Sequence, residues 1–261
     1  MVGQLAFRAL RNATFAMAIL MSPSAMAVED TTRELAKNLQ ARENLIALGE
    51  QIKALVTPES GFPKDRIARW SRAVDVAFAP ELLEADFLAA LDDRLSVEVK
   101  NAALAFDRSP LGQESYELAA ASNSPDEGGA IADGKAYVES ASAKENALFV
   151  ELFEAQSGPA RAKRALDIYF RAMTIAAEPI VGKQGAEQWV ASVQDLRAGY
   201  VENYFNVTVG IYSKLQGDKL AELVEALSTP EMLAYGKLST AAMGEAMDAA
   251  VERLEKAYAE E

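Results

Sequence analysis

The sequence predicts an all-α protein, and three observations favour that fold class. Apolar residues recur every three or four positions along most of the chain, which is the spacing of one face of a helix. Helix-start signals recur as well: in Ser109-Pro110 and Thr229-Pro230 a capping hydroxyl precedes a proline at the first helical position. No segment alternates between apolar and polar residues over the length of a strand, and the short β-branched run Val207-Thr208-Val209 fits a helix interior. We therefore expect a helical bundle.

The first 27 residues have the three parts of a secretory signal peptide. Arg8 and Arg11 form a basic start, residues 13–21 are an uncharged apolar run, and Ala25-Met26-Ala27 is an A-x-A cleavage site. The apolar run is about half the roughly 20 residues that span a bilayer. We therefore expect residues 1–27 to be removed, the mature chain to be exported to the periplasm or outside the cell, and no stable membrane insertion after cleavage.

The first half of the mature chain contains local start and stop signals for several helices. Thr31 and Glu34 are spaced as a capping box, and Pro58 ends the apolar series that follows. Pro80 suits the first position of a later helix, and Ser109-Pro110 starts the next one. In order, we expect helices over residues 31–56, 64–78 and 80–106, and from residue 110 onward.

The second half is punctuated in the same way. The segment from Ser124 to Glu127 is spaced as another capping box, while Gly158-Pro159 and Gly217 are helix breakers. We expect helices from residue 124 onward and over residues 147–153, 159–179, 186–215, 218–227 and 229–258.

A shift of 120 residues brings two parts of the chain into weak similarity. It places Leu95 on Leu215, Leu104 on Val224, Pro110 on Pro230 and Leu118 on Leu238. We therefore predict two weakly similar helical repeats after the signal peptide, over residues 28–140 and 141–261.

Composition excludes several kinds of chemistry. The chain of 261 residues has no cysteine and no histidine. It therefore lacks thiol nucleophiles, disulfides, the Ser-His-Asp triad, and the thiolate and imidazole ligands of zinc, di-iron and haem sites. We expect no cofactor, no metal site and no catalytic residue of a recognisable class.

The charge balance is strongly acidic. The formal net charge is −13; without Arg8 and Arg11 the mature chain has 24 basic and 39 acidic residues, a net charge of −15. Such a charge repels phosphate backbones, so we expect no nucleic-acid partner.

The segment Phe106-Asp107-Arg108-Ser109-Pro110-Leu111-Gly112-Gln113 combines an aromatic residue with a short Ser-Pro-x-Gly turn between helices. With Phe78-Ala79-Pro80-Glu81-Leu82 and Asp86-Phe87, it resembles the exported bacterial family known as domain of unknown function 2059. The resemblance covers residues 36–120 best; the corresponding segment 227–231 lacks both the aromatic residue and the glycine. It implies an exported helical protein and supplies no activity or catalytic residues.

Two groups of arginines lie in the opening turns of predicted helices, where the helix dipole opposes positive charge. They are Arg66 and Arg69 after Pro63, and Arg161 and Arg164 after Pro159. We interpret them as the candidate site for an anion or a partner; the alternative is a solvated face paired with carboxylates.

Trp189, Tyr200 and Tyr204 form an aromatic stripe at helical spacing. Such a stripe is typical of core packing, and the alternative is an apolar ligand groove between helices. A group of acidic residues fits either solvated helix starts or a pair of catalytic carboxylates; it consists of Glu81, Glu84, Asp86, Asp92 and Asp93.

These observations favour a non-enzymatic interaction or binding protein of the cell envelope, whose partner is an envelope protein or an apolar ligand. Two alternatives stay open. The first is a carrier of an apolar small molecule or lipid in an interhelical groove, and the second is a carboxylate-based hydrolase of envelope polymers. The carrier needs an enclosed apolar cavity, whereas the hydrolase needs two facing carboxylates in a cleft.

Overall fold

The structure is a computed structural model that describes residues 29–58, 62–122, 127–192 and 196–260. All regular structure in these ranges is helical, as predicted, and no strand occurs in them. In chain order the helices are α2 (Asp30–Asn38), α3 (Ala41–Lys53), α4 (Lys64–Ala77), α5 (Pro80–Asp92), α6 (Val97–Asp107), α7 (Pro110–Ser122), α8 (Glu127–Ser140), α9 (Ala143–Ala155), α10 (Gly158–Ser192), α11 (Leu196–Tyr212), α12 (Lys219–Leu227) and α13 (Pro230–Glu260). The expected leader and the capping box at Ser124 lie outside the described residues.

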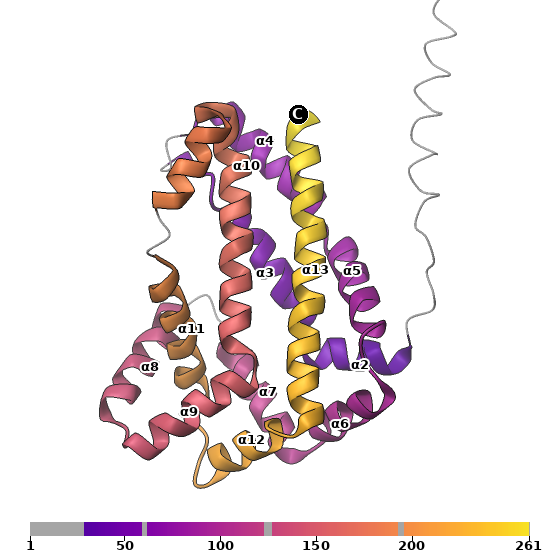
Figure 1. Cartoon of the computed structure of the whole chain (residues 1–261), viewed down its shortest axis with the longest axis vertical. Helices are drawn as coiled ribbons and strands as arrows, with labels where there is room; N and C mark the ends of the chain where they lie inside the picture. Colours follow the sequence, from indigo (N-terminus) through magenta and orange to yellow (C-terminus); the bar gives the residue numbers. More distant parts are fainter. Residues whose placement is uncertain (1–28, 59–61, 123–126, 193–195, 261) are drawn as a thin grey trace, which may run out of the picture.

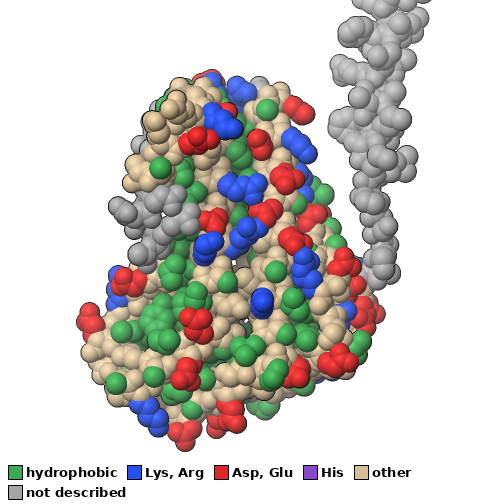
Figure 2. Space-filling view, in the orientation of Figure 1, with side chains coloured by type: hydrophobic (Ala, Val, Ile, Leu, Met, Phe, Trp, Pro, Cys, Tyr) green, Lys and Arg blue, Asp and Glu red, His purple; other side chains and the backbone are tan. Residues whose placement is uncertain are grey.

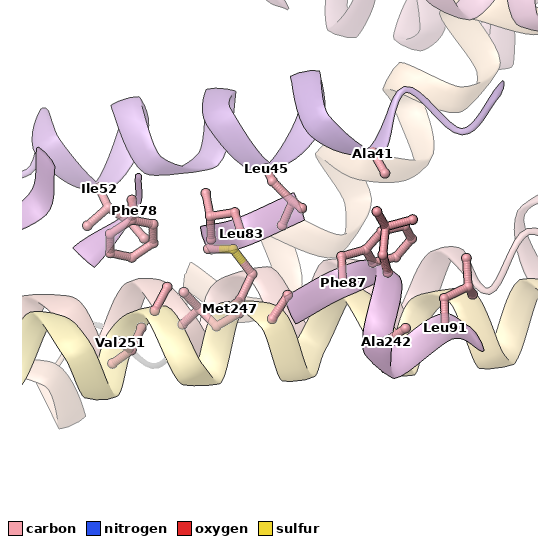
Figure 3. Close-up of a cluster of buried hydrophobic side chains, with 14 of the residues drawn as sticks. Ala41, Leu45, Ile52, Phe78, Leu83, Phe87, Leu91, Ala242, Met247 and Val251 are labelled. Carbon is pink, nitrogen blue, oxygen red and sulfur yellow. The ribbon is translucent and has the colours of Figure 1, made fainter. Parts of the chain in front are cut away.

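Helix α13 is the centre of the fold. It packs against α4, α5 and α6, and it runs beside the long helix α10 (Figure 1). Ala242, Ala246 and Ala250 recur every four residues along α13 and are completely buried. Met247 and Leu83 of α5 point toward each other in the same core (Figure 3). Small side chains in one row allow neighbouring helices to approach α13 closely, and the larger ones fill the space between them.

The main core joins the N-terminal helices to the end of the chain. Trp70 of α4 is completely buried, and its indole Nε1 donates a hydrogen bond to the carbonyl oxygen of Ile52 at 3.2 Å. Its ring meets the ring of Tyr258 edge to face, with 5.4 Å between centroids. The last turns of α13 are therefore held by α4, although 188 positions separate the two aromatic residues in the sequence.

A second core lies between α9, α11 and α12. Its largest completely buried side chains are Phe149, Leu152 and Leu223. The main core combines residues of α2–α6 with residues of α10 and α13, so side-chain packing crosses the predicted boundary at residue 140. The two-repeat division stays a prediction.

The turns at Ser109 and Thr229 nevertheless share one hydrogen-bond pattern. The Ser109 hydroxyl donates to the carbonyl oxygen of Phe106 at 2.7 Å and accepts from the N–H of Gly112 at 3.0 Å. The Thr229 hydroxyl makes the same two bonds at 3.4 Å, to the residues three before and three after it. A Cβ at Gly112 would overlap the Phe106 carbonyl, which explains the glycine of the tighter first turn.

Three predicted helix boundaries were wrong. The capping box at Thr31 does not form, because α2 begins at Asp30 and its N-cap is Glu29. The expected helix over 31–56 is divided at Gln40, whose left-handed φ of 49° separates α2 from α3. The expected helix over 80–106 is divided as well, because Ser96 accepts a bond from the N–H of Val99 and caps a new helix.

Helix α10 also differs from the expectation. It continues past Pro179 and bends at Gly182, where φ is 72° and ψ is 163°. Val190 beyond the bend packs against Leu166 and Phe170 before it. A glycine suits this position, because φ values in this range are unfavourable for other residues. The expected continuous helix over 186–215 is not tested across residues 193–195, which lie outside the described part.

Two glycines allow α8 and α11 to pack backbone against backbone. A Cβ at Gly134 of α8 would overlap the carbonyl oxygen of Asn206, and a Cβ at Gly210 of α11 would overlap that of Ala130. A Cβ at Gly199, which lies on the same helix α11, would meet nothing within 4 Å.

We predict opposite effects for two identical substitutions in α11. Gly210→Ala should lower the free energy of unfolding by about 1–3 kcal/mol, because the added methyl forces the two backbones apart. Gly199→Ala should raise it by up to about 1 kcal/mol, because alanine reduces the conformational entropy of the unfolded chain. Urea unfolding followed by circular dichroism measures both. Equal effects of the two substitutions would contradict the close contact.

Candidate functional site

The first predicted arginine group serves to hold the end of α13. Arg69 of α4 donates from Nη2 to the carbonyl oxygen of Tyr258 at 3.5 Å, and its guanidinium lies 5.7 Å from the centroid of the Tyr258 ring. Arg66 is on the same helix and is partly buried. The Arg69 contacts explain part of this group by packing.

The second predicted group faces α13 from α10. Arg161 donates from Nε to the hydroxyl of Thr240 at 3.0 Å. Arg164 donates from Nη2 to the carbonyl oxygen of Gly244 at 3.3 Å and to the carboxylate of Asp248. Since Thr240 and Tyr258 are 18 positions apart on α13, the two arginine groups lie roughly 27 Å apart along its axis. They form two separate sites.

Arg171 joins the second group and was missed by the sequence analysis. Its Nη1 lies 2.5 Å from Oδ1 of Asp248, the carboxylate that Arg164 also contacts. We call Arg161, Arg164 and Arg171 the arginine row. In Figure 2 basic side chains gather over α10 and α13, with acidic ones between them.

Gly244 of α13 makes room for Arg164. A Cβ at Gly244 would lie 2.7 Å from Nε of Arg164, whereas one at Gly236 would meet α9, 3.1 Å from the carbonyl oxygen of Ala155. The row can therefore lie along α13. The side chains of Arg164 and Arg171 keep 38 % and 44 % of their surface exposed.

The predicted tyrosines lie on the side of α10 that faces α11, whereas the arginine row lies on the side that faces α13. Tyr200 and Tyr204 of α11 stack on each other with 6.5 Å between centroids, and Tyr200 also meets Tyr169 of α10 at 6.4 Å. All three are partly exposed, and we call them the tyrosine cluster. Tyr204 also contacts Phe153 of α9, 6.2 Å between centroids. Trp189 lies in α10, but its side chain is outside the described part of the structure.

These ring contacts support the interpretation that Tyr200 and Tyr204 serve in packing, although part of each ring stays exposed. Figure 2 shows hydrophobic side chains gathering over α11, beside the basic side chains of α10 and α13. The arginine row and the tyrosine cluster therefore flank the same helix, and we call them together the contact face.

The acidic residues proposed as possible catalytic pairs are mostly bonded to cations. Glu81 and Glu84 both contact Arg42, at 3.7 Å and 2.8 Å. Asp86 contacts Arg253 at 2.6 Å.

Asp92 has a similar environment. Its carboxylate accepts bonds from Thr32 and from the buried Lys100, and these bonds hold the pKa of Asp92 below its usual value. The cluster fastens the start of α2 to α5 and α6, because Lys100 also contacts Glu29 at 2.7 Å. A structural role in packing therefore accounts for the position of Asp92.

A shallow groove of about 610 Å³ lies between α5 and α13. Its lining includes Asp86, Asp93 and Glu245, and the last of these pairs with Arg94. Within the described ranges, no three acidic side chains are grouped so as to hold a metal ion. No helix in those ranges is both long and apolar enough to cross a membrane.

Asp107 is the buried carboxylate of the segment 106–113 that contains the Ser109 turn. It is 4 % exposed, and it accepts bonds from the Tyr116 hydroxyl at 2.5 Å and from the Asn38 amide at 2.8 Å. Burial raises the pKa of Asp107, although both bonds favour its charged form. Asp107 thus joins α2, α6 and α7. The nearby ion pair between Glu34 and Arg108 is exposed. In the part of the chain that the structure describes, no second carboxylate is hydrogen-bonded to Asp107.

No family model, curated protein or solved structure matches the chain. The resemblance to the exported family, drawn from residues 36–120, therefore stays a prediction.

The residues that sequence reasoning missed differ in how visible they were. Arg171 lies seven positions after Arg164, two helical turns along the same face, so the helical period could have identified it. Asp248 gave no such signal, because its pairing with two arginines depends on the packing of α13 against α10.

We predict that Asp107 makes stability depend on pH in an unusual direction. Because its pKa is raised in the folded state, its favourable contribution is fully present below about pH 4 and is lost as the pH rises through the folded pKa. The free energy of unfolding of the wild type, relative to Asp107→Asn, should therefore fall as the pH rises above about 4. Urea unfolding at a series of pH values measures this difference.

The matched variant is Tyr116→Phe. It removes a donor that stabilises the Asp107 carboxylate, so the fall should move to higher pH. A difference between the wild type and Asp107→Asn that grows with pH would contradict the assignment.

Proposed function

We propose that the mature chain is a non-enzymatic binding protein of the bacterial cell envelope, and that it holds its partner against the contact face. The main observation in support of this proposal is that the arginine row and the tyrosine cluster flank the same helix, α10. Arginine and tyrosine are enriched at protein interfaces and dominate their binding energy. Partial exposure of both groups makes them accessible to a partner.

The proposed location rests on the sequence of the first 27 residues and on the resemblance to an exported family. Residues 1–27 have the order of a signal peptide, and Val28 would become the first residue of the mature chain. Helix α2 begins at Asp30, three positions after Ala27, the last residue of the proposed leader.

We predict that protein recovered from the periplasm of the native host begins at Val28. Mass spectrometry of the intact protein and of its N-terminal peptide measures this. An Ala27→Leu substitution should slow removal of the leader, because the cleavage site needs a small residue at that position. Full-length protein in the cytosol as the main species would contradict export.

The binding function is tested by capture from native periplasm with the mature protein as bait. We expect a protein partner that is retained by the wild type and lost, by at least about tenfold, from the double variant Tyr200→Ala with Tyr204→Ala. The matched control is Val76→Ala with Val97→Ala, which removes apolar surface that is 63 % and 67 % exposed elsewhere. Arg171→Glu tests the same face without removing a packed aromatic ring.

Each alternative function predicts a different result. Recovery of extracted lipid alone would favour the carrier of an apolar molecule. Turnover of an envelope polymer by purified protein, abolished by one substitution, would favour the hydrolase. Equal loss of the partner from the contact-face variants and from the control would show that the contact face is not the binding surface.

A further inference from the structure

We infer that the arginine row binds an acidic peptide segment of the partner, through carboxylates that lie about 13 Å apart. This inference rests on the proposed function, because it names the chemistry of the partner at the same contact face.

Asp248 shows that the row is already arranged to receive a carboxylate. Its Oδ1 contacts Nη1 of Arg171 and its Oδ2 contacts Nη2 of Arg164, so each oxygen meets a different guanidinium. The guanidinium group has five N–H donors in a planar fork that matches carboxylate geometry. One intramolecular carboxylate therefore leaves donors of both arginines unused.

The row also carries surplus positive charge. Arg164 and Arg171 share the single carboxylate of Asp248, and Arg161 bonds to the uncharged hydroxyl of Thr240. The neighbouring Lys163 pairs with Asp167 at 3.4 Å and so adds no net charge. In a chain with a formal charge of −13, this surface attracts anionic groups that the rest of the molecule repels.

The length of the row sets the spacing of the ligand's carboxylates. Arg161 and Arg171 are ten positions apart, roughly 15 Å along α10. In an extended peptide, residues four positions apart point to the same side and lie about 13 Å apart. Two glutamates at positions i and i+4 therefore match the two ends of the row.

An acidic peptide fits this surface better than a dense polyanion does. The surrounding acidic surface repels a chain or membrane that carries many charges, whereas a peptide with two carboxylates can meet the row alone. The tyrosine cluster on the other side of α10 offers partly exposed rings for the peptide's apolar side chains.

The experiment measures binding of a fluorescent 12-residue peptide to the full mature chain by anisotropy. The peptide carries Glu at positions 4 and 8 in an otherwise uncharged sequence, and its control carries Gln at both. We expect the Glu peptide to bind at least about tenfold more tightly, and its affinity to fall with salt. Arg164→Gln with Arg171→Gln should remove this preference, while Arg108→Gln, an exposed arginine paired with Glu34, should keep it.

The sharpest variant is Asp248→Asn. It removes the competing carboxylate, so affinity for the Glu peptide should rise several-fold. Asp75→Asn changes the net charge equally at a remote ion pair with Lys53 and should leave affinity unchanged. A gain confined to the Glu peptide distinguishes loss of the Asp248 charge from misfolding, because non-specific binding to a misfolded chain would raise affinity for the Gln peptide as well.

Two results would overturn the inference. The first is equal binding of the Glu and Gln peptides, or no response to Asp248→Asn. The second is inorganic polyphosphate that binds at least tenfold more tightly than the Glu peptide, which would assign the row to phosphate polymers. The two experiments also separate this inference from the proposed function. If partner capture depends on the tyrosines but the chain shows no preference for the Glu peptide, the proposed function stands and only this inference is removed.

Discussion

Close approach of helix backbones is the constraint on which this structure depends. Along α13, the row Ala242, Ala246 and Ala250 faces the main core, and Gly236 and Gly244 face α9 and α10. Small residues on two sides allow one helix to pack against several others, since interhelical distance is set by the side chains at the contact. The contact of α8 with α11 follows the same rule and is tighter still, because glycine at each crossing point brings one helix against the other's carbonyl oxygen.

That packing also determines where charge can be placed. Lys100 is buried but lies between Glu29 and Asp92, and Asp107 is buried but accepts two hydrogen bonds. A buried charge is tolerated only with such partners. The arginine row differs, because Arg164 and Arg171 share one carboxylate, Arg161 bonds to an uncharged hydroxyl, and the row stays partly exposed. Gly244 of α13 lets the long side chain of Arg164 lie along the helix, so the close packing that stabilises the fold also shapes the contact face.

Local signals predicted most helices because they act within a few residues. The turn at Ser109 formed as expected, since its hydroxyl caps the N–H three positions later. The breaks at Gln40 and Ser96 were not predicted, because the surrounding apolar periodicity continues through both. In the candidate site, Arg161 and Arg164 were identified from charge and position alone. Their separation from Arg66 and Arg69 followed only from the packing of α4 and α10 at different levels of α13.

The sequence by itself determined the helical class, the exclusion of thiol and imidazole chemistry, and the strongly acidic charge. These properties follow from residue types and from spacings within one helix. Tertiary structure alone decided that Asp248 lies between Arg164 and Arg171 and that Tyr258 ends against Trp70. Such contacts join residues far apart in the chain, and their formation depends on the relative placement of whole helices. No local pattern carries that information, because a given helical face can pack against many partners with similar free energy.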